Sequence, residues 1–280
     1  MLTSRILVFT LIFTFAFGYS FRNDLLKLYQ SLRGNLPKIE QLATNLATEV
    51  KEEVNIPPPL RADRESPSAF LTVAGTINQT NIQRANNNLP HLKINKILDQ
   101  TAAKKLQDMF TNQYFTHDSL SGIGVDGLAK EEGYSYITIG ENLALGNFET
   151  DATLVTAWMN SPGHRANILN TKYTEIGVAV GKGMYEGKQT WMAVQHFGRP
   201  LSDCPQPDSS LKAKFEDLKA QTDTKVNELE TKRQNLDQSN KEQVDEYNRF
   251  VEQYNSLVRE LKSLIEQYNS QVASFNQCAS

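Results

Sequence analysis

The sequence predicts an α+β domain followed by a long helical segment. Three stretches with apolar residues every three or four positions, at 68–87, 96–113 and 150–160, predict helices. Two stretches in which apolar residues alternate with small or polar ones, 174–181 and 190–197, predict strands. The C-terminal part instead carries an apolar seven-residue repeat, which is typical of paired helices.

Composition limits the function classes. With 280 residues, of which 39% are hydrophobic and 22% charged, the chain can form one core-sized domain plus additional elements. The formal net charge of −3 gives no reason to expect a nucleic acid partner. The sequence also lacks a phosphate-binding loop, an H-E-x-x-H zinc motif and a dinucleotide-binding fingerprint.

Residues 1–22 are predicted to be an export element. Arg5 precedes a largely apolar run at 6–21, which is slightly long for the core of a signal peptide and slightly short for a full membrane span. Small residues at Ala16 and Gly18 permit cleavage. The segment is therefore either a cleaved signal peptide or an uncleaved membrane anchor; a buried helix of a cytosolic protein is the less favoured alternative.

Residues 23–54 are predicted to contain an amphipathic helix. Apolar residues recur every three or four positions after Pro37, at Ile39, Leu42, Leu46, Val50 and Val54. The next segment, 55–67, contains three consecutive prolines, which lack the amide donor and favour an extended spacer. We expect a linker there and a domain at 68–200.

The C-terminal segment 201–280 is predicted to be helical throughout most of its length. Five consecutive heptads carry Val244, Val251, Val258, Ile265 and Val272 at one core position and Tyr247, Tyr254, Leu261, Tyr268 and Phe275 at the other. This pattern predicts a coiled coil. A weaker apolar seam at 211–236 precedes it, and a polar break at 237–241 separates the two.

The two cysteines, Cys204 and Cys278, bracket this segment, and residue 241 lies midway between them. A single continuous helix would hold them about 100 Å apart, at 1.5 Å per residue. An antiparallel hairpin would instead bring the sulfurs together, so we expect a disulfide formed in an oxidising compartment. Phe250, Leu257 and Leu264 widen the apolar stripe and indicate a third partner, either the 37–54 helix or another protomer through self-association.

Three central motifs carry the chain's chemistry: "YFTHDS" at 114–119, "GENLA" at 140–144 and "WMNSPGHRANIL" at 158–169. They contain His117, Glu141 and His164, a set suited to binding a cation or to acid/base work. Ser161 and Pro162 predict a helix start, with the serine as N-cap. In the first turn of that helix the dipole disfavours a charged His164.

The ordered set of motifs resembles the CAP superfamily, which contains cysteine-rich secretory proteins, antigen 5 and pathogenesis-related proteins, and in particular its bacterial SCP-like type. The resemblance covers residues 68–200 and also includes "N-x-x-R" at Asn81 and Arg84, "GYSY" and "IGVAV". It implies an α/β/α sandwich with a cleft over the sheet. The disulfides of the animal and plant members are missing, which favours a bacterial source.

The resemblance also implies a cleft lined by two histidines and two acidic residues, in which some members bind a divalent cation through the histidines. Here His117 and His164 would be the metal ligands, with zinc the expected cation and Glu141 beside them. The second acid is replaced by Ser161, so water would have to complete a tetrahedral zinc site. Asn142, Ser161 and Asn167 are expected to line or support the cleft.

Each of these residues also has a structural interpretation. Glu141 and Asn142 can instead hold the backbone by hydrogen bonds, and Asn167 is expected to be structural. His196 is assigned to packing or the surface, and His91 to an exposed loop. Neither Ser119 nor Ser161 has the partners of an activated nucleophile.

The sequence therefore predicts an exported protein, secreted or anchored at the cell envelope by its N-terminal helix. Its expected role is non-enzymatic binding of a divalent cation and of an extracellular lipid, glycan or protein. One alternative is a metal-dependent hydrolase in which a cation on His117 and His164 activates water and Glu141 moves the proton. The other is an assembly or spacer protein that acts through the coiled coil.

Overall fold

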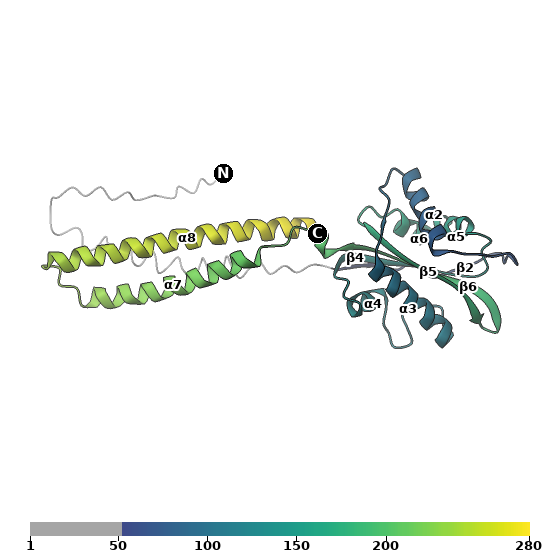
Figure 1. Ribbon diagram of the computed structural model, residues 1–280, viewed down its shortest axis with the longest axis horizontal. Helices are drawn as coiled ribbons and strands as arrows, with labels where there is room; N and C mark the ends of the chain where they lie inside the picture. Colours follow the sequence, from purple (N-terminus) through teal and green to yellow (C-terminus); the bar gives the residue numbers. More distant parts are fainter. Residues whose placement is uncertain (1–51) are drawn as a thin grey trace. The chain divides into compact units, whose positions relative to one another are not determined.

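The computed structural model describes residues 52–280, so the predicted export element and most of the predicted 23–54 helix lie outside the described residues. Two compact units are present: one contains residues 52–212 and 270–280, and the other contains 213–269. None of the helices in the described part has the length and apolar character needed to cross a membrane. Figure 1 labels the helices α2 to α8 and most of the strands.

The first unit is built on a mixed sheet with the strand order β1-β4-β6-β5-β3, in which β1 is Glu53–Asn55. Its three long strands are β4 (Tyr136–Leu145), β5 (Glu175–Tyr185) and β6 (Lys188–Pro200), which pair in antiparallel fashion. All ten residues of β4 are buried. The short β3 (Lys93–Ile94) pairs parallel with β5 at the far edge.

Helices cover both faces of this sheet, as Figure 1 shows. On one face lie α2 (Val73–Asn86), α5 (Asp151–Asn160) and α6 (Pro162–Ile168), whose apolar residues share a core with β5 and β6. On the other lie α3 (Lys96–Asn112), which packs mainly on β5 and β6, and α4 (Val125–Glu131), which packs beside β4. The fold is therefore a mixed α and β domain, as the sequence patterns predicted, with the three layers that the resemblance implied.

Side-chain caps fix where the helices begin. Residues 68–87 were expected to form one helix, but α2 starts at Val73 because Thr72 caps it by accepting from the amide of Gly75 at 2.9 Å. The amide of Thr72 is in turn held by the carboxylate of Asp151, also at 2.9 Å. In the same way, Asn95 accepts hydrogen bonds from the first turn of α3.

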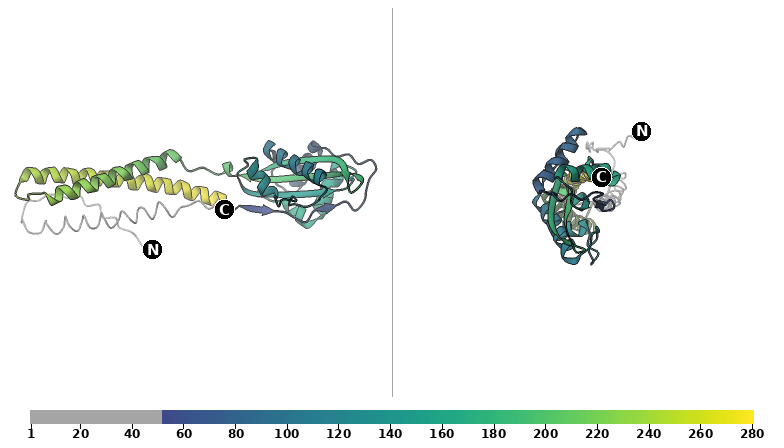
Figure 2. Two further views of the ribbon diagram at one scale, coloured as in Figure 1. Left: turned by 90° about the horizontal axis from the view of Figure 1, so that it is seen from below. Right: turned by 90° about the vertical axis from the view of Figure 1, so that its right-hand side faces the viewer.

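The structure corrects the expected spacer at 55–67 and the end of the expected 23–54 helix, of which only the last residues are described. Strands β1 (Glu53–Asn55) and β2 (Leu60–Arg61) both pair parallel with β4. The prolines do keep the backbone extended, but the residues on either side of them supply the hydrogen-bonding groups that complete the edge of β4. We call residues 53–61 the strap; it is the first coloured stretch of the ribbon in Figure 2.

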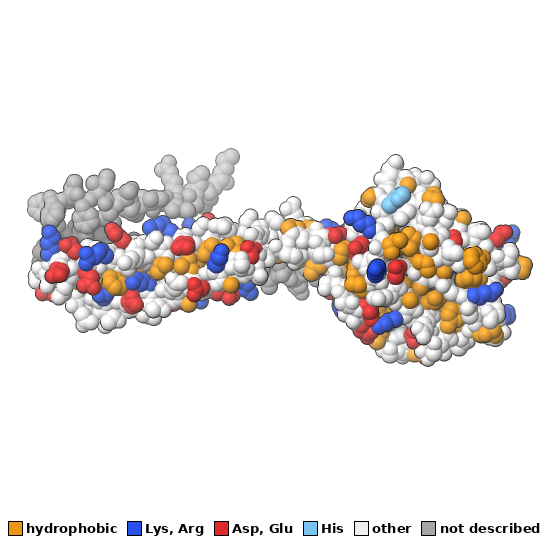
Figure 3. All heavy atoms as spheres, in the orientation of Figure 1, with side chains coloured by type: hydrophobic (Ala, Val, Ile, Leu, Met, Phe, Trp, Pro, Cys, Tyr) orange, Lys and Arg blue, Asp and Glu red, His pale blue; other side chains and the backbone are white. Residues whose placement is uncertain are grey.

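The C-terminal helices are α7 (Ser209–Gln234) and α8 (Lys241–Ala279), joined at the predicted polar break. Within 213–269 they pack antiparallel. Phe215 and Leu218 contact Leu261 and Ile265, while Leu229 contacts Tyr247 and Tyr254 nearer the turn. Figure 3 shows acidic and basic side chains interspersed along these helices. Coiled-coil supercoiling and self-association stay predictions.

The expected disulfide joins Cys204 and Cys278. Cys204 is buried in a cluster with Ile137 and Phe275, and the guanidinium of Arg199 donates to the carbonyl oxygen of Cys278 at 3.1 Å. Residues 270–280, which the sequence assigned to the hairpin, therefore pack with the sheet unit. The connection after β6 contains a short 3-10 helix, η1 (Leu201–Asp203).

Candidate functional site

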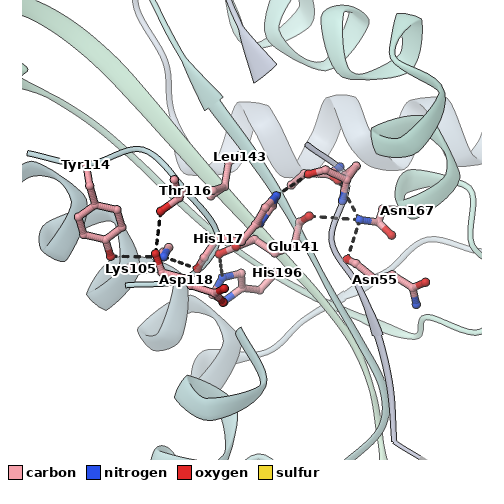
Figure 4. A network of polar contacts seen from close by, with 12 residues as sticks. Asn55, Lys105, Tyr114, Thr116, His117, Asp118, Glu141, Leu143, Asn167 and His196 are labelled. Atoms are coloured by element: carbon pink, nitrogen blue, oxygen red, sulfur yellow. Dashed lines mark hydrogen bonds and ion pairs between the residues drawn. The ribbon is translucent and has the colours of Figure 1, made fainter. Parts of the chain in front are cut away.

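Glu141 lies at the middle of β4, and its side chain is fully buried between two histidines (Figure 4). Its Oε1 lies 2.6 Å from Nδ1 of His117, and its Oε2 lies 2.8 Å from Nε2 of His196. Burial alone would raise the pKa of the carboxyl group, but the hydrogen bonds and positive charge of the two rings lower it to about 2. Glu141 is therefore a carboxylate whose two oxygens are both engaged.

His196 is the residue that sequence reasoning missed. Strand register places it directly opposite Glu141 on β6, with its side chain completely buried. Its Nδ1 pairs with the hydroxyl of Thr101 on α3 at 2.8 Å, and that hydroxyl donates its own hydrogen to the carbonyl oxygen of Leu98. The sequence feature that could have indicated His196 is the alternation of residue types along β6. This alternation identifies Glu141 as the partner of His196 only when the register between β4 and β6 is known.

His117 follows α3 in a loop, and its ring is held from both sides. Nδ1 faces the carboxylate of Glu141, and Nε2 contacts the carbonyl oxygen of Pro57. Both neighbours are acceptors, so both contacts are hydrogen bonds only when each ring nitrogen carries a hydrogen. The site therefore presents an N–H donor of His117 toward the strap.

A buried lysine fixes the loop that carries His117. The ammonium group of Lys105 donates to the carbonyl oxygen of His117 and to the hydroxyl of Tyr114, which in turn donates to Asp108. Burial lowers the pKa of Lys105, and the nearby carboxylates of Glu141 and Asp108 oppose that change. Burial is the larger cause, and the hydrogen bond to Asp108 the second, that raises the pKa of the Tyr114 hydroxyl. The hydroxyl therefore stays neutral and can donate its hydrogen.

His164 lies in the first turn of α6, as predicted, and is buried. Burial first, and the charge of His117 second, lower the pKa of His164 to about 4, so its ring is neutral near pH 7. Nδ1 pairs with the hydroxyl of Ser161 at 2.8 Å, while Nε2 has no hydrogen-bond partner among residues 52–280. Ser161 stands at the N-cap position, but its side chain bonds the ring of His164 and not the helix backbone.

Two amides tie α6 to the sheet. Asn142 donates to the carbonyl oxygen of His164 at 3.3 Å and to Gln195 at 3.1 Å. The two N–H groups of Asn167 are shared among three acceptors: the side-chain oxygen of Asn142 at 3.0 Å and the carbonyl oxygens of Glu141 and Asn55, both at 3.2 Å. Both residues support the cleft, and Asn167 also contacts the strap directly.

The predicted zinc site does not fit this arrangement. Both ring nitrogens of His117 and both oxygens of Glu141 have partners, and Ser161 occupies Nδ1 of His164. Within residues 52–280 no three His, Cys, Asp or Glu side chains are grouped so as to hold a metal ion. Of the predicted ligand atoms, all of which lie among the described residues, only Nε2 of His164 would be available to a cation, and a structural zinc site takes four ligands.

Comparison with known proteins gives a family match over part of the chain. Residues 77–197 match the family model of CAP, the Cysteine-rich secretory protein family. Two Bacillus subtilis (strain 168) proteins are similar: "Uncharacterized protein YkwD", 42% identical over 40% of this chain and 42% of its own length, and "Uncharacterized membrane protein YlbC", 32% identical over 38% and 30%. The chain thus matches less than half of the length of either relative.

Two solved structures are similar to part of the chain. An extracellular protein containing a SCP domain from Bacillus anthracis is 30% identical, with a TM-score of 0.39 over 45% of this chain and 40% of the other. An outer surface protein from Borrelia burgdorferi is 26% identical, with a TM-score of 0.39 over 44% of this chain and 89% of the other.

Proposed function

The chain belongs to the CAP superfamily through residues 77–197, and on this premise we propose that its sheet unit is an exported binding module without catalytic activity. The observation that carries this proposal is the state of Glu141. A general base needs a lone pair directed at the substrate. The oxygens of Glu141 instead meet the rings of His117 and His196 inside the protein.

The other candidate base, His164, is also poorly suited to catalysis. Its lowered pKa of about 4 makes it a weak base, and Nε2 has no acidic partner in the described part of the chain to orient the ring. A serine nucleophile needs a base that is itself oriented by a third group. The pair of Ser161 and His164 has no carboxylate as that third group in the described part of the chain, so the hydrolase alternative receives no support from this geometry.

Among lipid, glycan and protein ligands, the contacts at the site favour a protein. His117 and Asn167 both donate to main-chain carbonyl oxygens, those of Pro57 and Asn55. Such donors recognise an extended backbone whatever its side chains. No metal ion is needed for this recognition.

Export rests on two independent features of the chain. The first is the apolar run at 6–21, which has the composition of a signal or anchor segment. The second is the Cys204–Cys278 disulfide, a bond that persists in oxidising compartments outside the cytosol. We place the binding module at the cell envelope or outside the cell.

A hydrolysis panel tests the proposal. Full-length protein would be assayed on peptide, ester, glycan and phosphodiester substrates beside the Glu141→Gln variant, with circular dichroism to check that the variant folds. We expect no turnover above the buffer rate in either protein. Turnover by the wild type that disappears in a folded Glu141→Gln variant would overturn the proposal and favour the hydrolase.

A further inference from the structure

The strap lies on the candidate site as a ligand would. Its two ends pair with β4 through Asn55↔Gly140 and Leu60↔Ala144, and the three prolines cross between these points. Pro57 is buried there, whereas the adjacent Pro58 is exposed. Pro59 is half-buried, so Pro57 is the one proline of the three that is fully buried against the protein.

The polar contacts of the strap are those of a bound extended peptide. The ring of His117 meets the carbonyl oxygen of Pro57, and the amide of Asn167 donates to that of Asn55 at 3.2 Å. In both cases the site supplies the hydrogen and the strap supplies a main-chain oxygen. Added strands are recognised in this way at sheet edges, with pockets for particular side chains giving specificity.

The pocket for Pro57 is made by a glycine. A Cβ atom added to Gly163, at the start of α6, would lie only 2.6 Å from Cβ of Pro57. The missing side chain of Gly163 therefore makes the room in which the proline ring sits. A proline also holds the extended conformation before binding, which lowers the entropy lost on docking.

We propose that the β4 edge, His117, Gly163 and Asn167 form a binding groove for an extended, proline-containing polypeptide, and that the strap occupies this groove as an intramolecular ligand. This inference rests on the proposed function as a binding module and names its ligand class. A partner segment has to displace the strap before it binds. Its apparent affinity is therefore the intrinsic affinity multiplied by the fraction of molecules in which the groove is open.

Two features make the strap displaceable. Val54 and Ile56 are 40% and 47% exposed, so little apolar surface holds the strap in place. Its ion pair from Glu53 to Lys172 lies at the surface, where such pairs contribute little. Segments with few buried contacts open locally at a lower free energy than the core.

Peptide binding to the full-length chain tests the proposal. In one variant, residues 53–59 are replaced by glycine and serine at equal length, which empties the groove. The probe is a fluorescein-labelled peptide of residues 52–62, measured by fluorescence anisotropy. We expect this variant to bind the peptide at least about tenfold more tightly than the wild-type chain, in which the strap competes.

Two changes test the proline pocket. The Pro57→Ala peptide is expected to bind about tenfold more weakly than the unchanged peptide, while the matched Pro58→Ala peptide binds equally well. A Gly163→Ala substitution in the strap-replaced chain is also expected to weaken binding about tenfold, because the added methyl group fills the pocket.

Failure to bind the peptide by a strap-replaced chain that is folded by circular dichroism would overturn the proposal, as would equal losses for the two proline substitutions. If that chain does not fold, hydrogen exchange on the wild type decides. Excess peptide must then speed the exchange of residues 53–61, and unchanged exchange refutes the groove. If the groove proposal fails and no Glu141-dependent hydrolysis is seen, the proposed binding module stands, with a lipid or glycan as its ligand. Glu141-dependent hydrolysis would instead overturn the proposed function, so the two failures are distinguishable.

Discussion

Nε2 of His196 lies 2.8 Å from Oε2 of Glu141, and both side chains are fully buried on neighbouring antiparallel strands. The contact supplies one of the two hydrogen bonds that keep the Glu141 carboxylate charged in the interior. A buried charge without such partners is strongly destabilising. His196 is therefore as much a part of the site as His117, although its ring has no access to solvent.

Replacing His196 is expected to be costly. His196→Ala leaves one oxygen of Glu141 buried without a partner, and we expect the free energy of unfolding to fall by about 3–5 kcal/mol. The measurement is urea denaturation of the full chain. His91→Ala is the control, because His91 is exposed and should change stability by less than about 0.5 kcal/mol. Similarly small changes in stability for both variants would contradict the role of His196 as a partner of the buried Glu141 carboxylate.

Stability should decline with acid in two stages. The pKa of His164 is about 4 in the folded chain and 6.5 in the unfolded chain. As the pH drops from 6.5 to 4, the unfolded chain therefore binds this proton before the folded chain does, and stability falls. Glu141 has a folded pKa of about 2 against 4.5, so its contribution is lost between pH 4.5 and 2. A difference of one between the folded and unfolded pKa corresponds to about 1.4 kcal/mol of stability.

Thermal melting as a function of pH measures this decline. The His164→Gln variant should show a flatter profile between pH 6.5 and 4 and keep the steep loss at lower pH. A His164→Gln profile that still falls as steeply as the wild type in the upper window would show that another group is responsible.

The disulfide should contribute a measurable part of the stability. Cys204 and Cys278 close a loop of 74 residues in sequence separation. On the chain-entropy account a loop of this length stabilises by roughly 4–5 kcal/mol. The Cys204→Ala/Cys278→Ala variant should therefore melt at a lower temperature and exchange the amides of residues 270–280 faster. Unchanged exchange there would mean that packing around Phe275 alone holds the end of α8.

Zinc should not bind tightly to the wild-type chain. The ligand atoms of His117 and Glu141 already have partners inside the protein. Titration calorimetry with zinc chloride should therefore give the same weak heats for the wild type and for the His117→Ala/His164→Ala variant. A strong binding isotherm that is lost in the double variant would restore the cation site that the sequence predicted.

Much of the fold was predictable because its signals are local. Apolar periodicity located α3 and α5, and the heptads of α8 together with the spacing of Cys204 and Cys278 indicated the hairpin. The motifs also placed His117 and Glu141 in one site, where they are in direct contact.

The missed features depend on pairing between distant strands. His196 reaches Glu141 only through the register of β4 with β6, and Pro57 reaches His117 only because the strap pairs with β4. A one-residue slip in register would turn His196 to the opposite face. Nothing near either residue in the sequence encodes these contacts, so the proline run was interpreted as a spacer.

The hydrogen bond between the ring of His117 and the strap can be tested most directly by NMR. In full-length protein labelled with ¹⁵N and ¹³C, we predict a hydrogen on Nε2 of His117 and a through-hydrogen-bond coupling from that nitrogen to the carbonyl carbon of Pro57. An Nε2 without hydrogen and without this coupling, in a chain whose Glu141–His196 contact is intact, would contradict the account.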